Sequence, residues 1–294
     1  MELGLGTVQF GLDYGISNTT GKVPPEGVQA ILECAHEKGI RVLDTAAAYG
    51  DSELVIGNTL KPEWQFRIVT KLPALKKNAV THDEITLLET AFRQSLHRPK
   101  RTRLAGILMH SPGDMLVPGG EAAYKLLLSF KESGAAEKIG ISVYTADEID
   151  RIFYHYDFDL VQLPLNVLDQ RLLRSGHIRQ LKAKGVEVHV RSAFLQGLLL
   201  MPNDRIDPYF SPIMPVLQRY ADYRKQNNLN PCEGAIMFLR TQKDIDVVLT
   251  GVTSKQELNG NLNAFTRKFT SSLDFADFAV DTETMLNPRY WKID

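Results

Sequence analysis

The sequence predicts a single α/β domain, spanning residues 1–294, with the closed (β/α)8 architecture of a TIM barrel. Three observations lead to this fold class. Eight short apolar, β-branched runs recur along the chain, a segment with helical periodicity follows most of them, and no linker or low-complexity stretch interrupts the order. Alternating strands and helices favour a parallel sheet. Eight such units in 294 residues fit a closed barrel, which typically needs about 250 residues.

The expected elements follow one another in a regular order. The eight strands are expected at residues 3–5, 41–44, 66–71, 104–109, 138–142, 160–163, 186–191 and 246–250. Helices are expected at residues 25–38, 52–60, 83–97, 121–133, 146–154, 172–184 and 214–226, with an eighth at 254–262. Gly39, Gly134 and Gly185 directly follow three of these helices, as helix-stop glycines do. Thr81 and Glu84 have the spacing of a capping box.

A doubly wound open sheet is the alternative architecture, because it shows the same alternation of strands and helices. Its usual phosphate-binding fingerprint, GxGxxG, is incomplete in this chain. Gly4 and Gly6 match the first two glycines, but Gln9 stands at the third. The missing glycine favours the closed barrel.

The composition favours a small molecule as the partner. The chain has 34 basic and 35 acidic residues, so no excess of positive charge would attract nucleic acid or an anionic membrane. Cys34 and Cys232 form no CxxC motif, which is typical of reduced thiols in the cytoplasm. No signal-peptide pattern and no apolar run of bilayer-spanning length are present. We expect a cytoplasmic protein that binds neither nucleic acid nor membrane, whereas the sequence does not predict its oligomeric state.

Polar residues stand at or directly after the carboxyl ends of the expected strands, where the active sites of closed βα barrels lie. These residues are Asp44, Lys71, His110, Ser142, Gln162, Arg191 and Gly251. Three successive strands supply an acidic, a basic and an imidazole group, and Tyr49 follows in the loop after the first of them. One polar residue at a strand end is common, but four such groups at one mouth indicate a catalytic site.

The four groups suit proton transfer to a carbonyl oxygen. A tyrosine has a pKa near 10 and is a weak acid at neutral pH. The ammonium group of Lys71 is expected to lower the pKa of Tyr49, while Asp44 keeps Lys71 charged. His110 would orient the carbonyl oxygen. Such a general acid protonates the carbonyl oxygen while a hydride donor reduces the carbonyl carbon.

The chain resembles the aldo-keto reductase superfamily over nearly its whole length. The most diagnostic match is residues 43–50 (LDTAAAYG), followed closely by Glu53. Residues 69–71 (VTK) and 108–110 (LMH) complete the Asp–Tyr–Lys–His tetrad of that family. Further matches in the right order are residues 5–7 (LGT), 140–142 (GIS), 162–166 (QLPLN), 195–199 (LQGLL) and 251–254 (GVTS), with Glu257 and Asn261 behind them.

The resemblance implies an NAD(P)H-dependent oxidoreductase that reduces an aldehyde, ketone or aldose to an alcohol by hydride transfer, or runs in reverse. Tyr49 would be the general acid or base, with Lys71 and Asp44 tuning it and His110 orienting the carbonyl. No metal is implied. The implied cofactor-binding residues are Gly6, Thr7, Asp44, Ser142, Gln162, Arg191, Ser192, Leu195, Gly197, Gly251, Thr253, Ser254, Glu257 and Asn261.

Three positions depart from the family pattern. Val143 replaces the asparagine that usually follows the position of Ser142, which removes a polar contact. Arg191 stands where an aromatic ring often stacks on the nicotinamide, and its positive charge would weaken binding of the cationic oxidised cofactor. Glu257 stands near the place where NADPH-preferring relatives carry an arginine for the 2′-phosphate. A carboxylate suits a ribose hydroxyl instead, so NADH or dual use is expected.

The substrate pocket is less well defined by the sequence. Phe10, Tyr14 and Asn166 are expected to line it together with Tyr49 and His110, a mixture that suits a small polyhydroxylated or anionic carbonyl compound. Residues 191–197 (RSAFLQG) look like bacterial family members of sugar metabolism, which favours an aldose or a sugar-derived substrate. The aromatic-rich segment 266–294 is expected to pack on or near the barrel mouth, or alternatively to cover one side of the barrel.

Two other functions stay open at this stage. The first is a regulatory barrel that binds a cofactor but has little catalytic activity. The second is a lyase or isomerase in which Lys71 forms a Schiff base with the substrate. Each tetrad residue also has an ordinary structural role open to it. Asp44 would cap a turn, Tyr49 would pack, Lys71 would reach solvent, and His110 would be an interior histidine.

Overall fold

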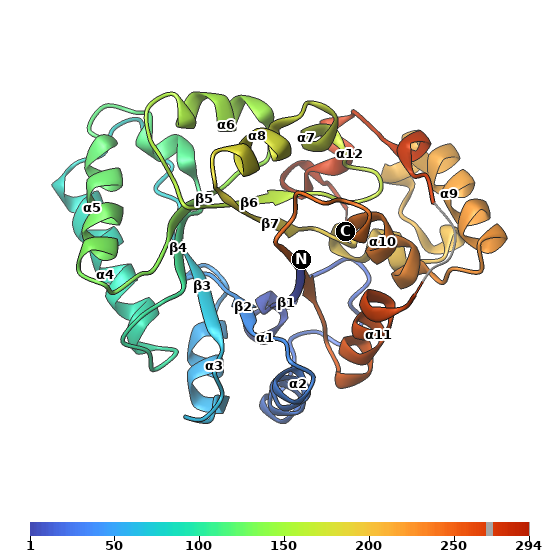
Figure 1. Ribbon diagram of the computed structural model, residues 1–294, viewed down its shortest axis with the longest axis horizontal. Helices are drawn as coiled ribbons and strands as arrows, with labels where there is room; N and C mark the ends of the chain where they lie inside the picture. The colour runs from blue at the N-terminus through green and yellow to red at the C-terminus, as the bar shows by residue number, and fades with distance from the viewer. Residues whose placement is uncertain (269–272, 294) are drawn as a thin grey trace.

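The computed structural model describes residues 1–268 and 273–293, so residues 269–272 and 294 of the predicted C-terminal segment lie outside the described residues. Its strands form a closed parallel barrel in sequence order, with β1 paired to both β2 and β8. The strands are β1 (Glu2–Gly6), β2 (Val42–Asp44), β3 (Arg67–Leu72), β4 (Gly106–Met109), β5 (Ile139–Ser142), β6 (Leu160–Pro164), β7 (Glu187–Arg191) and β8 (Val247–Gly251). The predicted (β/α)8 fold is confirmed, and every predicted strand overlaps an observed one (Figure 1).

Helices surround the barrel (Figure 1). The α-helices are α1 (Val8–Gly11), α2 (Pro25–Glu37), α3 (Ser52–Thr59), α4 (His82–His97), α5 (Glu121–Glu132), α6 (Ala146–Phe153), α7 (Arg171–Arg174), α8 (His177–Ala183), α9 (Met214–Gln226), α10 (Pro231–Arg240), α11 (Lys255–Thr266) and α12 (Glu283–Leu286). Short 3-10 helices are η1 (Pro112–Met115), η2 (Leu195–Leu200), η3 (Asn203–Arg205), η4 (Pro208–Ile213), η5 (Ala276–Phe278) and η6 (Pro288–Tyr290). The stop glycines Gly39, Gly134 and Gly185 have φ of 81°, 75° and 77°, and the Thr81–Glu84 capping box is present, as predicted.

Besides the short helices α1 and α12, which were not predicted, the helices differ from the expectation at two places. The predicted helix at 172–184 is two helices, α7 and α8, because Gly176 between them has a φ of 79° and breaks the helical path. Helix α10 was not predicted, although Asn230 and Glu233 form a capping box at its start and Pro231 is its first residue. Residues 234–239 of α10 are all buried. A short, continuously buried run does not distinguish a helix from a strand in the sequence.

Large apolar side chains pack inside the barrel, and glycines make room for them. Two small clusters lie apart from the main core, Val42, Val247 and Leu249 in one and Val69, Leu108 and Leu160 in the other. A Cβ atom on Gly4 would lie 2.8 Å from the Leu249 side chain, and one on Gly140 would lie 2.1 Å from the Leu160 carbonyl oxygen. The filled interior leaves room for a site only at the ends of the strands.

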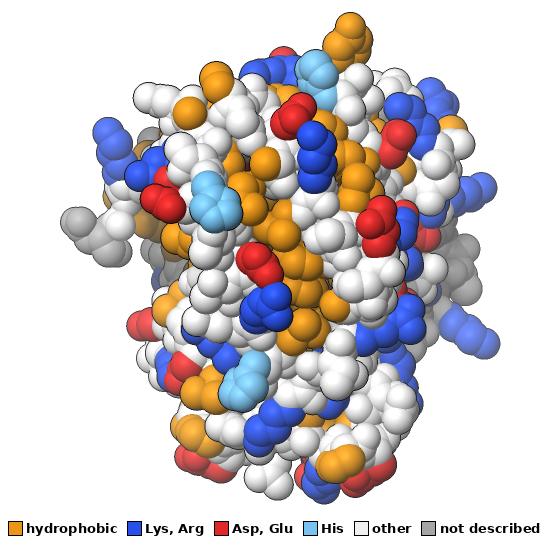
Figure 2. All heavy atoms as spheres, turned by 90° about the vertical axis from the view of Figure 1, so that its left-hand side faces the viewer, with side chains coloured by type: hydrophobic (Ala, Val, Ile, Leu, Met, Phe, Trp, Pro, Cys, Tyr) orange, Lys and Arg blue, Asp and Glu red, His pale blue; other side chains and the backbone are white. Residues whose placement is uncertain are grey.

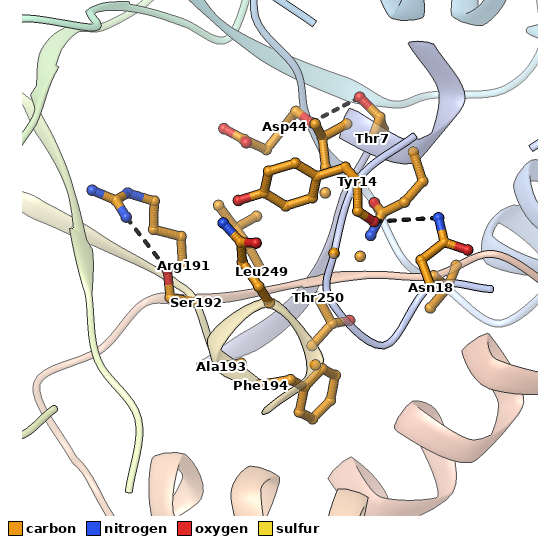
Figure 3. Close-up of a pocket in the computed structure, with 18 of the residues that line it drawn as sticks. Thr7, Tyr14, Asn18, Asp44, Arg191, Ser192, Ala193, Phe194, Leu249 and Thr250 are labelled. Atoms are coloured by element: carbon orange, nitrogen blue, oxygen red, sulfur yellow. Dashed lines mark hydrogen bonds between the residues drawn. The ribbon is translucent and has the colours of Figure 1, made fainter. Parts of the chain in front are cut away.

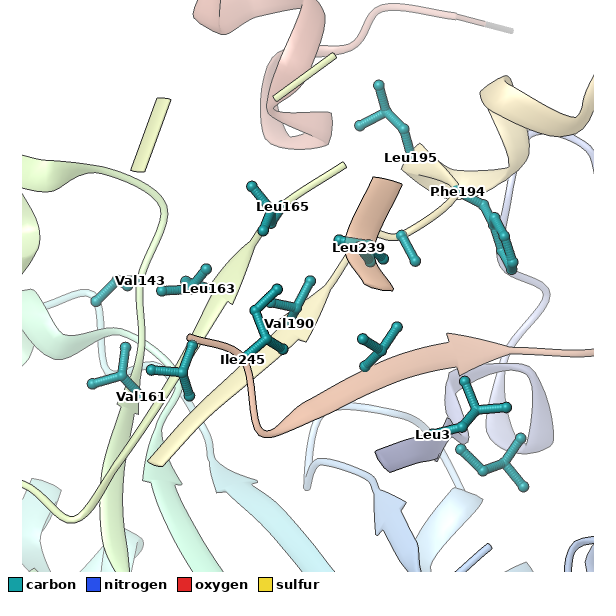
Figure 4. Packing of buried hydrophobic residues seen from close by; sticks show 14 of the residues in the cluster. Leu3, Val143, Val161, Leu163, Leu165, Val190, Phe194, Leu195, Leu239 and Ile245 are labelled. Atoms are coloured by element: carbon teal, nitrogen blue, oxygen red, sulfur yellow. The ribbon is translucent and has the colours of Figure 1, made fainter. Parts of the chain in front are cut away.

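The main hydrophobic core lies between the barrel and its helices. Leu163 of β6, Val190 of β7 and Leu239 of α10 belong to this core and lie near one another in Figure 4. On the outer face shown in Figure 2, acidic and basic side chains are interspersed around a strip of apolar ones. No helix among residues 1–268 and 273–293 has the length and apolar character needed to cross a membrane.

The C-terminal segment packs against the helices that follow β7 and also reaches the barrel mouth. Phe278 lies against Tyr223 of α9, with ring centroids 5.2 Å apart, and Trp291 meets Phe210 of η4 edge to face at 4.9 Å. Between these contacts, η6 brings Arg289 to the pocket described below.

Candidate active site

A pocket of about 600 Å³ opens where the strands end. The predicted site residues that line it are Gly6, Thr7, Tyr14, Asp44, Tyr49, Lys71, His110, Ser142, Gln162, Arg191, Ser192, Gly197, Gly251, Thr253, Glu257 and Asn261. Figure 3 shows Tyr14, Asp44 and Arg191 around the opening, where they come from the segment after β1, from β2 and from β7. The parallel topology therefore gathers residues that are far apart in the sequence.

Four predicted residues lie elsewhere. The side chains of Phe10 and Leu195 are fully buried in the hydrophobic core and do not line the pocket, because their apolar surface packs between barrel and helices. Asn166 is also fully buried, and its Oδ1 accepts hydrogen bonds from two backbone N–H groups of the loop after β6. Ser254 caps α11 by accepting from the backbone N–H of Glu257. These residues shape the backbone around the pocket and do not face its interior.

Several pocket residues were not singled out from the sequence. They include Gln9, Tyr144, Phe194, Thr250 and Arg289. Tyr144 lies in the loop directly after β5, so the rule that places sites at strand ends would have found it. Arg289 belongs to the C-terminal segment and follows no strand, so no local pattern indicates its position.

A buried ion pair forms the floor of the catalytic end. Lys71 is fully buried, and its Nζ donates to both carboxylate oxygens of Asp44, at 2.8 and 2.7 Å, and to the carbonyl oxygen of Thr45 at 2.9 Å. Gln162 Nε2 donates to Asp44 Oδ1 at 2.6 Å. All three N–H bonds of the ammonium group are thus engaged. A Schiff base needs a free electron pair on this nitrogen, so the geometry disfavours Lys71 as a nucleophile.

Tyr49 lies above this ion pair and beside His110. The Lys71 ammonium is 5.0 Å from the centroid of the Tyr49 ring, and the rings of Tyr49 and His110 are perpendicular with centroids 6.3 Å apart. The predicted fall in the pKa of Tyr49 is wrong. Desolvation inside the pocket raises the pKa of Tyr49, the charge of Asp44 adds to this rise, and Arg191 only partly opposes it. The Tyr49 hydroxyl is therefore fully protonated at neutral pH.

His110 is neutral at the same pH. Burial, followed by the charges of Lys71 and Arg191, lowers the pKa of His110 to about 3. Burial also lowers the pKa of Lys71, although the neighbouring Asp44 carboxylate opposes the change. The site thus combines a protonated phenol and a neutral imidazole, which can both donate a hydrogen bond to a single oxygen atom, with an ammonium group whose N–H bonds are already engaged.

The low pKa of His110 predicts a defined pH dependence of stability. Its ordinary value is 6.5 and its value in the folded chain is about 3, so between these pH values the unfolded chain binds the extra proton. The free energy of unfolding should therefore fall as the pH is lowered through about 6.5. Urea denaturation at about pH 7 and pH 5 should show a smaller loss for His110→Gln than for the unchanged protein. If the free energy of unfolding falls equally in both proteins, His110 does not cause the pH dependence.

Unpaired polar atoms and a strained loop fit a nicotinamide cofactor. Gln162 Oε1 and Thr250 Oγ1 are buried without a hydrogen-bond partner among the described residues. The amide N–H₂ group of a nicotinamide is a suitable hydrogen-bond donor for Gln162 Oε1.

The loop after β7 has a strained backbone. Ser192, Leu195 and Gln196 have φ of 61°, 47° and 54°, although none is a glycine. Such backbone strain, about 1–3 kcal/mol per residue, is concentrated at ligand-binding segments.

The end of the pocket that is lined by α11, called here the far end, is acidic. Glu257 lines it together with Asn261, and Glu257 Oε2 accepts the backbone N–H of Thr253 at 2.7 Å. The lysine and arginine side chains that line the pocket all act on His110 at the catalytic end. Among the described residues, the far end therefore offers no side-chain cation for a phosphate group and one carboxylate for a hydroxyl.

Comparisons with known proteins show the family of the chain. Residues 2–276 match the model of the aldo/keto reductase family. An aldo-keto reductase of Mycolicibacterium smegmatis is 29% identical over 140 residues, so the match spans 45% of this chain and 45% of that protein.

The fold is shared with solved structures. The holo form of an aldo-keto reductase from Bacillus halodurans has a TM-score of 0.73 and 18% identity, covering 92% of this chain and 88% of that one. A glycerol dehydrogenase from Gluconobacter oxydans has a TM-score of 0.69 and 18% identity, covering 99% of this chain and 93% of that one. Because the family match extends over nearly the whole chain, the protein belongs to the aldo/keto reductase family.

Proposed function

We propose that the protein reduces an aldehyde, ketone or aldose with NADH or NADPH, or catalyses the reverse reaction, and that Tyr49 is its general acid and base. One observation carries this proposal. The centroid of the Tyr49 ring lies 5.0 Å from the Lys71 ammonium group and 6.3 Å from that of the His110 ring in a single pocket, where Tyr49 is protonated and His110 is neutral. These groups are suited to protonate a carbonyl oxygen as it becomes an alkoxide.

Each residue has a separate task in this reaction. The nicotinamide cofactor, when bound, supplies the hydride. His110 donates one N–H bond to the carbonyl oxygen and fixes its position. Tyr49 then gives its hydroxyl proton to the same oxygen, and the positive charge of Lys71 stabilises the phenolate that remains. In the reverse reaction the phenolate of Tyr49 accepts the proton of the alcohol.

The residues that would hold the cofactor lie on both sides of the tetrad. Ser142 and Gln162 would bind the nicotinamide amide, since Gln162 Oε1 is a buried acceptor without a partner among the described residues. The loop after β7 and residues 251–261 would hold the remainder, with Glu257 facing a ribose hydroxyl. The substrate is proposed to be a small polyhydroxylated carbonyl compound. The similar fold of a glycerol dehydrogenase agrees with that choice.

The acidic far end predicts the cofactor preference. Titration with NADH and NADPH, followed by quenching of tryptophan fluorescence, should give micromolar affinity with NADH bound as tightly as NADPH or more tightly. Glu257→Gln keeps the acceptor for Thr253 and removes the charge, so it should improve the NADPH affinity relative to NADH by about fivefold. Lys255→Gln, which changes a neighbouring exposed charge, is the control.

Two results would contradict these proposals. If NADPH binds at least about tenfold more tightly than NADH, a charge-assisted contact must hold the 2′-phosphate and the role given to Glu257 is wrong. If neither cofactor binds, the proposed reaction itself fails.

A further inference from the structure

Two arginine side chains share one aromatic ring at the catalytic end of the pocket. The guanidinium carbon of Arg191 lies 3.9 Å from the centroid of the Tyr144 ring, and that of Arg289 lies 4.1 Å from the same centroid. All three residues line the pocket. The ring holds both planar cations in place and leaves their edges available for hydrogen bonds.

No carboxylate among the described residues forms an ion pair with either arginine. Arg191 donates to the carbonyl oxygen of Val143 at 3.0 Å and to Ser192 Oγ at 3.4 Å, the second of which is drawn in Figure 3. The side chain of Arg289 has no hydrogen-bond acceptor among the described residues. Elsewhere in the described chain, Arg171 is paired with the carboxylate of Asp169. Two cations without carboxylate partners therefore remain at the mouth.

The acidic residues of the pocket do not compensate for these charges. Asp44 is already paired with Lys71, and Glu257 lies at the far end. The charges of Arg191 and Arg289 both help to lower the pKa of His110, so both arginines act on the place where the carbonyl group would react. The catalytic end thus carries an excess of positive charge.

Arg289 is held in position by its segment. Asn287 Oδ1 accepts the backbone N–H of Arg289 at 3.2 Å and starts η6. On either side, the hydroxyl of Tyr209 donates to the carbonyl oxygen of Thr284 at 3.0 Å, and Trp291 Nε1 donates to that of Met285 at 3.3 Å. An arginine on an anchored turn loses less entropy on binding than one on a free tail.

We propose that the substrate carries an anionic group, a carboxylate or a phosphate, which Arg191 and Arg289 bind beside Tyr144 while the carbonyl group lies at Tyr49 and His110. This inference rests on the proposed carbonyl reduction and adds the substrate class to it. Guanidinium groups form strong, directional hydrogen bonds with both kinds of anion. Because the two cations stand at the mouth, they would also attract such a substrate to the pocket.

Paired substrates test this proposal. Succinic semialdehyde is compared with butanal, and glyceraldehyde 3-phosphate with glyceraldehyde, at saturating NADH or NADPH. In at least one pair, kcat/KM of the anionic member should exceed that of the neutral member by about tenfold or more. Arg191→Gln and Arg289→Gln should each reduce this ratio by about fivefold, mainly through KM. The pair that responds identifies the carboxylate or the phosphate.

Controls separate this proposal from its alternatives. Arg205→Gln removes the same charge from the adjoining cavity, outside the main pocket, and should leave the ratio unchanged. The proposed anionic substrate would be wrong if the ratio of kcat/KM values is near one in both pairs. It would also be wrong if Arg289→Gln loses cofactor affinity without a change in this ratio. Neither result would contradict the proposed carbonyl reduction. If no carbonyl compound is reduced, the proposed reaction fails. In that case, binding of glycerol 3-phosphate that depends on Arg289 would still support the anion site, and its absence would overturn it.

Discussion

Tyr49→Phe is expected to lower kcat for carbonyl reduction by about 10²- to 10⁴-fold while changing the affinity for the reduced cofactor by less than about twofold. The variant lacks the Tyr49 hydroxyl proton, which the proposed reaction transfers to the carbonyl oxygen. The raised pKa of Tyr49 keeps its hydroxyl protonated, whereas the lowered pKa of His110 leaves that residue without an acidic proton at neutral pH. Single-turnover kinetics and fluorescence titration measure the two quantities separately.

Tyr14→Phe provides the matched comparison, because Tyr14 contributes another phenol to the same pocket. Among the described residues, no hydrogen bond joins the Tyr14 hydroxyl to Lys71 or Asp44, so its loss should reduce kcat by less than about tenfold. A Tyr49→Phe variant with nearly full kcat would show that the proton comes from another donor. Loss of cofactor affinity together with kcat would point to a binding role of Tyr49.

Much of the fold follows from local patterns in the sequence. Apolar β-branched runs and stop glycines such as Gly39 act over a few residues, so they predict where strands and helices lie. The same patterns fail where burial is uniform. Helix α10 is buried without a break along residues 234–239, a run that fits a strand as well as a helix, and the break at Gly176 depends on a local φ of 79°.

The candidate site follows from topology more than from residue type. Asp44, Lys71 and Gln162 could be placed together because parallel strands end at one mouth, and the structure joins all three through hydrogen bonds. Arg289 could not be placed, because only the tertiary packing of the C-terminal segment brings it to the pocket. The direction of the Tyr49 pKa shift was also beyond the sequence, since desolvation depends on how closely the pocket encloses the hydroxyl.

Breaking the buried ion pair should have the largest effect on stability. In Lys71→Met the carboxylate of Asp44, a residue that is 5% exposed, keeps one hydrogen bond from a described residue, that of Gln162. Removing one partner of a buried pair typically costs about 3–5 kcal/mol, because the other charge is left uncompensated. Asp44→Asn should destabilise the chain for the same reason, and urea denaturation measures both changes.

The double variant Asp44→Asn/Lys71→Met separates the structural role of the pair from its catalytic role. Since neither charge is left alone, its loss of stability should be smaller than the sum of the single losses by roughly 0.5–3 kcal/mol. Its kcat should stay as low as that of Lys71→Met, because no cation remains to stabilise the Tyr49 phenolate. Additive losses of stability would mean that the two charges do not interact in folding. Recovery of kcat along with stability would instead show that the pair supports the fold and that Tyr49 needs no neighbouring cation.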